Sequence, residues 1–366
     1  MKIHIRKETV DPAPVGKCND IALVSDLDGD GRPDIVMGGK LWPHATELDP
    51  ATYPNLSWYR FPGWERLPIG TGDLEAGGTT LDITGNGLPD IVAGEQGKGH
   101  RLFWWENPGA FDTPTPWRRR VLTDRFERYH DQFATDIDGD GRQELLVLSQ
   151  NAGVFFYFDI PENPRIEPWP EGSLQIIAEN FVAEGIQAAD IDGDGEAEIF
   201  VGHHLFKRDP ARPRGPWQHR TLLPDLKWSR CCLADLRGSG HVDLVLSEAE
   251  QPDSRLLWLE GPDYQRVHEL GTDFCALHTL GCADFSGNGL PDILAAEMAL
   301  VEGRMPRVLL FLNGGEGRFT RHAFENPLGC HEGKLFPYPG ERAPRLLIKP
   351  YAPANFLELW SFVFPG

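Results

Sequence analysis

Histidines that stand close to carboxylates are the residues of this chain best suited to chemistry. A histidine titrates near neutral pH, so its ring can take up or release a proton, and its ring nitrogens can bind a divalent metal. Combined with carboxylates, such groups suit the removal of a proton beside a carbonyl or carboxylate and the loss of a leaving group. The histidines in question are His130, His203, His204, His278 and His331.

Motifs for several other kinds of chemistry are absent from the sequence. It contains no G-x-S-x-G nucleophile elbow, no P-loop, no H-E-x-x-H zinc motif and no dinucleotide-binding glycine pattern. No serine or cysteine stands out as the nucleophile of a triad. The two kinds of chemistry that remain are proton transfer by the histidines and metal binding by them.

The elements that must position these histidines surround an acidic loop, first seen as DLDGDGRPDIV. Its acids at positions 1, 3, 5 and 9 are Asp26, Asp28, Asp30 and Asp34. This spacing offers several oxygens to a hard cation such as calcium. An EF-hand would need a glutamate at position 12 and a following helix, but position 12 is Met37 and the surrounding residues are typical of a strand. The loop therefore joins two strands.

The loop recurs at intervals of roughly 50 residues, which is typical of propellers and other repeat folds. A second apolar strand follows each loop, then an aromatic-rich third strand and, in most copies, a fourth, as in a propeller blade. Seven third strands can be counted. The prediction is an all-β, seven-bladed β-propeller with four-stranded blades, forming one domain over residues 1–366. The N-terminal strand 3–10 is expected to complete the last blade with residues 331–362 and so to close the ring.

The repeated D-x-D-G-D-G-x-x-D pattern between strands resembles the FG-GAP/VCBS repeats of integrin-type seven-bladed propellers, over nearly the whole chain. The resemblance implies that the loops bind calcium or magnesium and brace each blade. The loops of blades 1, 3 and 4 match in full. The ligands that the resemblance implies are Asp26, Asp28, Asp30, Asp34, Asp136, Asp138, Asp140, Glu144, Asp190, Asp192, Asp194 and Glu198.

The remaining loops depart from this pattern. Blades 2 and 6 keep oxygen-bearing side chains with less charge, so they are expected to bind a metal more weakly or not at all. In blade 5, Arg237 stands at position 3, where it would place a cation in the position of the metal, and no metal is expected there. The acidic loops are thus interpreted as structural, and a fold alone does not indicate an activity.

Functional residues are expected at the opposite ends of the blades, at one mouth of the predicted channel. The residues about six before each loop and about thirteen after its first aspartate meet there, and titratable side chains gathered in a cleft are a common sign of an active site. The loop 40–55 is long enough to form a wall of this mouth. The candidate catalytic residues are Tyr129, His130, His203, His204, Arg230 and Lys349. The candidate sugar-binding residues are Asp20, Glu95, Glu184 and Glu248.

Two halves of a site are predicted at this mouth. One contains His130, His203 and His204, on adjacent blades. The other contains the predicted divalent-metal ligands His278, His331 and Glu297, together with Lys349. One half would bind the metal and the other would move protons, and the sequence does not rank which does which.

A second resemblance concerns activity. The phrases WWENPG…WRRRVL and WLEGPD…VHEL, together with the histidines, resemble propeller polysaccharide lyases of the rhamnose–glucuronate lyase type and aldos-2-ulose (anhydrofructose) dehydratase. This resemblance implies metal-assisted β-elimination on a sugar or a uronate-containing oligosaccharide. Two alternatives stay open: a non-enzymatic carbohydrate- or protein-binding propeller, integrin-like or lectin-like, and a sugar epimerase or isomerase. Each single histidine also has a plain interpretation as a hydrogen-bonded scaffold residue.

Composition limits the partners and the compartment. The formal net charge is −20, which disfavours nucleic acid as a partner. No segment has the ~18 consecutive apolar residues of a membrane helix, and the first residues lack a signal region. The chain as written is therefore expected to be cytoplasmic, or periplasmic or secreted if an export signal has been removed. A sugar or oligosaccharide ligand and a monomeric state are expected, without membrane association.

Overall fold

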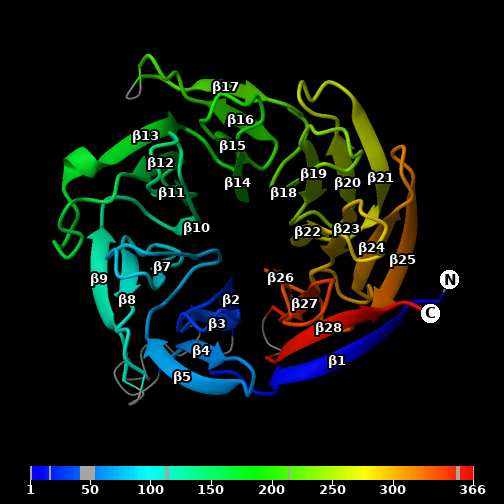
Figure 1. Cartoon of the computed structure of the whole chain (residues 1–366), viewed down its shortest axis with the longest axis horizontal. Coiled ribbons are helices and arrows are strands. Elements are labelled where there is room, and N and C mark those ends of the chain that lie inside the picture. Colours follow the sequence, from blue (N-terminus) through cyan, green and yellow to red (C-terminus); the bar gives the residue numbers. More distant parts are fainter. Residues whose placement is uncertain are drawn as a thin grey trace. The chain divides into compact units, whose positions relative to one another are not determined.

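The computed structural model describes residues 2–15, 18–41, 54–111, 115–212, 215–351 and 355–365, with the side chains of 18 and 19 excepted. Strands dominate this part of the chain, and its one helical element is the 3₁₀ turn Glu171–Ser173. The strands form seven four-stranded antiparallel sheets, each a blade (Figure 1). The predicted all-β, seven-blade fold is confirmed. Most of the loop 40–55, predicted to form a wall, lies outside the described residues.

Contacts divide the chain into two compact units, described separately. The three-blade unit contains Ala13–Glu184 and Arg208–Trp217. Its sheets are, in strand order, blade 1 with β2 (Cys18–Ser25), β3 (Asp34–Lys40), β4 (Leu56–Arg60) and β5 (Glu65–Gly70); blade 2 with β6 (Thr79–Leu81), β7 (Asp90–Gly94), β8 (Leu102–Glu106) and β9 (Arg118–Thr123); and blade 3 with β10 (Tyr129–Thr135), β11 (Glu144–Ser149), β12 (Val154–Phe158) and β13 (Leu174–Glu179).

The four-blade unit contains Met1–Pro12, Gly185–Lys207 and Gln218–Gly366. Its sheets are blade 4 with β14 (Ile186–Ala189), β15 (Glu198–Val201), β16 (His204–Lys207) and β17 (Gln218–Thr221); blade 5 with β18 (Ser229–Ala234), β19 (Asp243–Glu248), β20 (Ser254–Leu259) and β21 (Val267–Phe274); blade 6 with β22 (Thr279–Ala283), β23 (Asp292–Ala296), β24 (Arg307–Asn313) and β25 (Phe319–Glu325); and blade 7 with β26 (Lys334–Phe336), β27 (Arg345–Ile348), β28 (Leu357–Val363) and β1 (His4–Asp11).

Blade 7 is completed by the N-terminal strand, as the sequence predicts. β1 pairs antiparallel with β28, with Lys7 opposite Trp360, and both chain ends lie beside this pair (Figure 1). The ammonium of Lys7 lies 3.9 Å from the centre of the Trp360 ring, which adds a cation–π contact to the backbone pairing. The first strand of the chain thus covers what would otherwise be the open edge of β28.

Burial follows the position of a strand within its blade. Every residue of the second strands β7, β11, β19 and β23 is buried, because these strands pack on both faces. The outermost strand β25 instead mixes exposed and half-buried residues along its length. Large aromatic side chains such as Trp58, Trp105 and Trp117 fill the space between blades 1 and 2.

The acidic loops are built alike around a glycine and two carboxylates. In blade 1, the amide of Gly31 donates to Asp26 over 2.8 Å, and the φ of +82° at Gly31 is one that side-chain-bearing residues rarely adopt. The buried Asp34 accepts hydrogen bonds from the amides of Leu27 (3.2 Å) and Phe61 (2.8 Å). The ninth-position acid therefore ties the loop to the end of the third strand.

Burial changes the acidity of these ninth-position carboxyls. Desolvation raises the pKa of Asp34 to about 6, and it raises the pKa values of Asp90 and Glu144 to about 7. In blade 3, repulsion from the neighbouring Asp138 and Asp140 adds to this effect. The loops thus concentrate negative charge that a cation would stabilise. Across the described residues, no helix is long and apolar enough to cross a membrane.

Candidate functional site

Titratable side chains converge in the four-blade unit at the strand ends opposite the acidic loops. Each loop joins the first strand of a blade to the second, so the start of the first strand and the end of the second share the opposite side. Blades 5, 6 and 7 bring a cluster together there, hereafter the Glu332 cluster. Its members are Arg230, His278, His331, Glu332, Lys334, Lys349 and Tyr351.

Glu332 is the hub of this cluster. Its carboxylate pairs with the guanidinium of Arg230 and lies 3.0 Å from the ammonium of Lys334 and 3.4 Å from Nδ1 of His278. Burial alone would raise the pKa of Glu332, but the positive charges of Arg230 and Lys334 outweigh burial and hold this pKa well below its usual range. Glu332 also has a φ of +55°, an uncommon backbone conformation for a side-chain-bearing residue. The carboxylate is therefore ionised and fixed.

His331 lies beside Glu332 in sequence and contacts three further members of the cluster. Its ring centre is 4.3 Å from that of His278 and 4.8 Å from that of Tyr351, and its Nδ1 is 3.4 Å from the ammonium nitrogen of Lys349. Burial, together with the charges of His278 and Lys349, lowers the pKa of His331 well below its usual range. The imidazole is neutral at physiological pH and can accept a proton.

The cluster combines three basic side chains with one carboxylate. Lys349 and Glu332 are almost completely buried, whereas Tyr351 is 38% exposed. A buried excess of positive charge is unusual in a chain whose formal net charge is −20. The arrangement suits an anionic ligand that enters from the side of Tyr351 and Lys334.

The predicted mouth metal site takes a different form. Both carboxylate oxygens of Glu297 accept hydrogen bonds, one from the side chain (2.7 Å) of Arg307 and the amide (2.9 Å) of Cys275, the other from the amide of Arg307. Among the described residues, the groups of three ligand atoms within 4.8 Å of one another include His278, with Glu250 in the same group, but neither Glu297 nor His331. The structure thus brings His278 and His331 together but gives Glu297 an arginine partner.

The same glutamate–arginine pairing occurs in other blades. Glu248 at the end of β19 binds the guanidinium of Arg255 at 2.9 and 3.0 Å, and Glu95 after β7 pairs with Arg101. Each arginine lies just before or at the start of the third strand, so the pair fixes the turn between second and third strands. A sugar-binding role of Glu95 and Glu248 stays a prediction, and it would have to involve these arginines.

His203 and His204 lie in a separate cluster on blade 4. Nδ1 of His203 is 2.8 Å from the hydroxyl of Ser229, and Nδ1 of His204 is 3.0 Å from Nε2 of His219. Burial lowers the pKa of His203 to about 4 and that of His204 to about 3, so both rings are neutral at pH 7. Their predicted catalytic role stays a prediction.

The three-blade unit holds its own histidine, with a carboxylate partner. Nδ1 of His130 is 2.7 Å from Asp131, and both side chains are nearly buried. A carboxylate bound to one ring nitrogen of a histidine fixes the tautomer and orientation of the ring. The hydroxyl of the neighbouring Tyr129 accepts a hydrogen bond from the amide of Phe126, and burial raises the pKa of Tyr129 to about 12. Tyr129 therefore supports the backbone at the start of β10.

Buried ion pairs surround Asp20, a predicted sugar-binding residue of this unit. Asp20 lies 2.7 Å from the ammonium of Lys40, which is also 3.5 Å from Glu75. Glu75 in turn binds Arg128 at 2.9 Å. Burial alone would raise the pKa of Glu75, but the surrounding positive charges lower it. Glu184, another predicted sugar ligand, is completely buried.

Sequence reasoning did not select Glu332 and Asp131 as site residues, although both stand beside a selected histidine. The signal is the local His-Glu and His-Asp pair, seen in CHEGK and YHDQ. In a regular strand, successive side chains point to opposite faces. Where the start of a strand is irregular, a carboxylate that directly follows a histidine can lie beside its ring.

Three acidic loops have the geometry to hold a metal ion. Ligand oxygens lie within 4.8 Å of one another in the groups Asp26, Asp28 and Asp34; Asp136, Asp138 and Glu144; and Asp190, Asp192 and Asp194. Carboxylates at this spacing fit calcium or magnesium. Bound there, such an ion would offset the negative charge of the carboxylates and would brace the loop.

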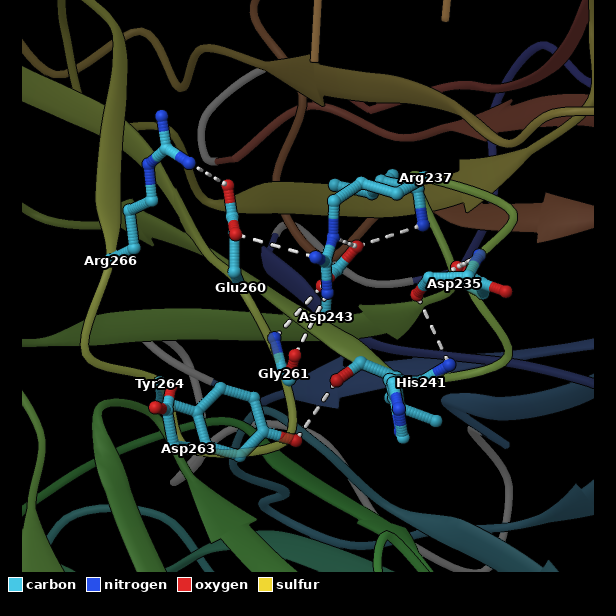
Figure 2. A network of polar contacts seen from close by, with 12 residues as sticks. Asp235, Arg237, His241, Asp243, Glu260, Gly261, Asp263, Tyr264 and Arg266 are labelled. Carbon is cyan, nitrogen blue, oxygen red and sulfur yellow. Dashed lines mark hydrogen bonds and ion pairs between the residues drawn. The ribbon is translucent and has the colours of Figure 1, made fainter. Parts of the chain in front are cut away.

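Blade 5 replaces that charge with its own arginine. The guanidinium of Arg237 binds Asp243 at 2.9 Å, Glu260 at 3.3 Å and the carbonyl of Gly261 at 2.8 Å (Figure 2). These contacts join the loop to the end of β20. Arg237 thus lies against the ninth-position acid, as its place at position 3 of the loop predicts.

Comparison with known proteins supports the repeat. A family model described as FG-GAP-like repeat matches residues 82–147 and 136–201, each of which spans two successive acidic loops. The chain contains FG-GAP-like repeats. A search of curated proteins gives no match.

Solved structures extend the likeness to the fold. They include BBS1N from a crystal structure of its complex with ARL6DN, soaked with lead, with a TM-score of 0.59, 11% identity and 98% coverage of both chains. Another is the V. cholerae biofilm matrix protein Bap1, with a TM-score of 0.46, 13% identity and coverage of 96% of this chain and 68% of that one. At 11% identity, the similarity to BBS1N concerns the fold alone and gives no information about activity.

Proposed function

We propose that the Glu332 cluster binds a carboxylate-bearing sugar, such as a uronate residue of an oligosaccharide, and catalyses β-elimination on it as a carbon–oxygen lyase. The observation that supports this proposal most is the buried excess of positive charge beside the neutral ring of His331. β-Elimination next to a carboxylate needs both, because the proton to be removed becomes acidic only when the carboxylate charge is stabilised.

Four side chains of the cluster have roles in this proposal. Arg230 and Lys334 bind the substrate carboxylate and offset its negative charge. His331 takes the proton from the carbon beside that carboxylate, and the electron pair forms a carbon–carbon double bond as the carbon–oxygen bond breaks. Tyr351, whose ring centre is 4.8 Å from that of His331 and which is partly exposed, donates the proton of its hydroxyl to the departing oxygen.

A second candidate is a binding propeller without turnover, for which the ligand is the same anionic sugar or an acidic protein segment. The close pairing of Glu332 with Arg230 and Lys334 favours it, because ion pairs that hold side chains in place are also what a rigid binding surface requires. An epimerase would share the proton transfer and return the proton to the same carbon.

The test is an elimination assay on uronate-containing oligosaccharides, keto-sugars and anhydrofructose, followed by the ultraviolet absorbance of the new conjugated double bond. His331→Asn is expected to lower turnover by 100-fold or more, in line with the usual loss of a general base. His322→Asn, on the outer strand β25, is the matched control in the same unit. A substrate that binds without absorbance change would favour the binding propeller.

A further inference from the structure

The blade-4 loop is where the FG-GAP pattern and the structure disagree. Its acid ladder matches in full, but Lys207 from β16 reaches into it. The Nζ atom of Lys207 lies 2.6 Å from Asp192, 2.8 Å from Asp194 and 2.5 Å from Glu198. These three carboxylates occupy positions 3, 5 and 9 of the loop, which are metal-ligand positions in the pattern.

An ammonium in this position makes the contacts that a cation would make. It has three N–H donors, and three carboxylates accept them within charge-assisted hydrogen-bond distance. A lysine side chain carries its positive charge at physiological pH, so the ammonium can act as a permanent cation in this position.

Strand register shows that blades differ in the residue at this place: in blade 1 it is also a base, Arg60, whose guanidinium lies 2.6 Å from Asp28. Lys207 follows Phe206, which pairs with Ile199 directly after the ninth-position acid. In blade 3, Phe158 pairs in the same way with Leu145, and the next residue is Asp159. Blade 4 therefore has a base, and blade 3 an acid, at the same place beside otherwise identical ladders.

We propose that Lys207 is an internal cation that takes the place of the divalent ion in the blade-4 loop, whereas the blade-3 loop depends on a bound metal. At the blade-3 ladder, the guanidinium of Arg208 lies 3.5 Å from Asp138. That single longer contact leaves the charges of Asp136 and Asp140 without the close cation that blade 4 has.

A pocket of about 230 Å³ makes the blade-4 loop accessible to an ion. It is lined by Asp192, Glu198, Lys207 and His219 among others. Removal of the ammonium would therefore open a solvent-accessible group of carboxylates rather than a sealed void. The proposal concerns the FG-GAP loops only and is independent of the Glu332 cluster.

Calcium titration calorimetry on the whole chain, after treatment with a chelator, tests the proposal. Asp192→Asn with Asp194→Asn should leave the calcium stoichiometry of the wild type unchanged, whereas Asp136→Asn with Asp138→Asn should lower it by one ion. Lys207→Gln should add one ion and make the melting temperature rise more on calcium addition than in the wild type.

Two results would overturn the proposal. One is the loss of a calcium ion from the wild-type stoichiometry on Asp192→Asn with Asp194→Asn. The other is a folded Lys207→Gln variant that binds no additional calcium. If Lys207→Gln folds only when calcium is present, that result supports the proposal, since the ion then restores the charge that the lysine supplied.

Discussion

The side-chain amide of Asn107, after the third strand of blade 2, donates a 2.8 Å hydrogen bond to the backbone carbonyl of Leu27 in the acidic loop of blade 1. In the four-blade unit, Asn313 makes the same bond to Leu236, over 2.7 Å. Both asparagines are almost completely buried. The acidic loops thus also join neighbouring blades through asparagines that sit outside the acid ladder.

Asn107→Ala is expected to destabilise the protein by about 2 kcal/mol, because it leaves the carbonyls of Leu27 and Pro89 without this donor in a buried site. Urea unfolding measures the change. Asn151→Ala is the control, since Asn151 donates to Gly97 at an exposed position and should cost less than about 1 kcal/mol. Equal costs for the two variants would contradict the interblade role.

Arg237→Met is expected to cost about 2–3 kcal/mol, because it leaves the fully buried Asp243 with two backbone donors and no cation. Chemical denaturation is again the measurement. Arg266→Met removes a highly exposed arginine that lies 3.5 Å from Glu260, and it should change stability by less than about 0.5 kcal/mol. A neutral result for Arg237→Met would show that its loop needs no cation.

The contribution of His203 to stability should fall as pH drops from about 6.5 to about 4, because its ring stays neutral in the fold, whereas the same ring in the unfolded chain takes up a proton. The unfolded state binds more protons in this window, so the contribution is complete above it and lost below it. The loss for His203 is about 1–2 kcal/mol after allowance for solvent screening. His203→Asn should reduce the difference in the free energy of unfolding between pH 7 and pH 5, measured by denaturation. The same difference in the variant and the wild type would contradict this role of His203.

Arg230→Lys is expected to raise the KM of the elimination more than it lowers kcat, because lysine keeps the charge but loses the planar fork that binds carboxylates. Steady-state kinetics on the active substrate provide both constants. The melting temperature of the same variant reports on its pairing with Glu332. A fall in kcat at constant KM would instead place Arg230 at the step of bond cleavage.

The fold follows from the sequence because its signals are local and repeated. A glycine at position 6 and an acid at position 9 define each loop within nine residues, and an apolar second strand follows directly. Closure of blade 7 by β1 was also predictable, since the last third strand lacks a successor in the chain.

The partners of the charged residues were much harder to predict. Glu297 and Glu248 each bind an arginine of the following strand, and Lys207 reaches carboxylates from 9 to 15 residues earlier in the chain. Strand alternation gives the face on which a side chain lies, but the direction of a long flexible side chain depends on the charges that surround it in the fold. The contacts of Glu332 depend on how blades 5, 6 and 7 lie together, and no local sequence pattern predicts that arrangement.

The central claim is that the Glu332 cluster performs elimination on an anionic sugar. The most direct measurement is the ultraviolet absorbance of wild type, His331→Asn and Tyr351→Phe incubated with uronate-containing oligosaccharides under identical conditions. The account predicts a steady rise for the wild type and a loss of at least about 100-fold for His331→Asn, with both proteins equally folded. A folded His331→Asn variant that matches the wild-type rate would contradict it.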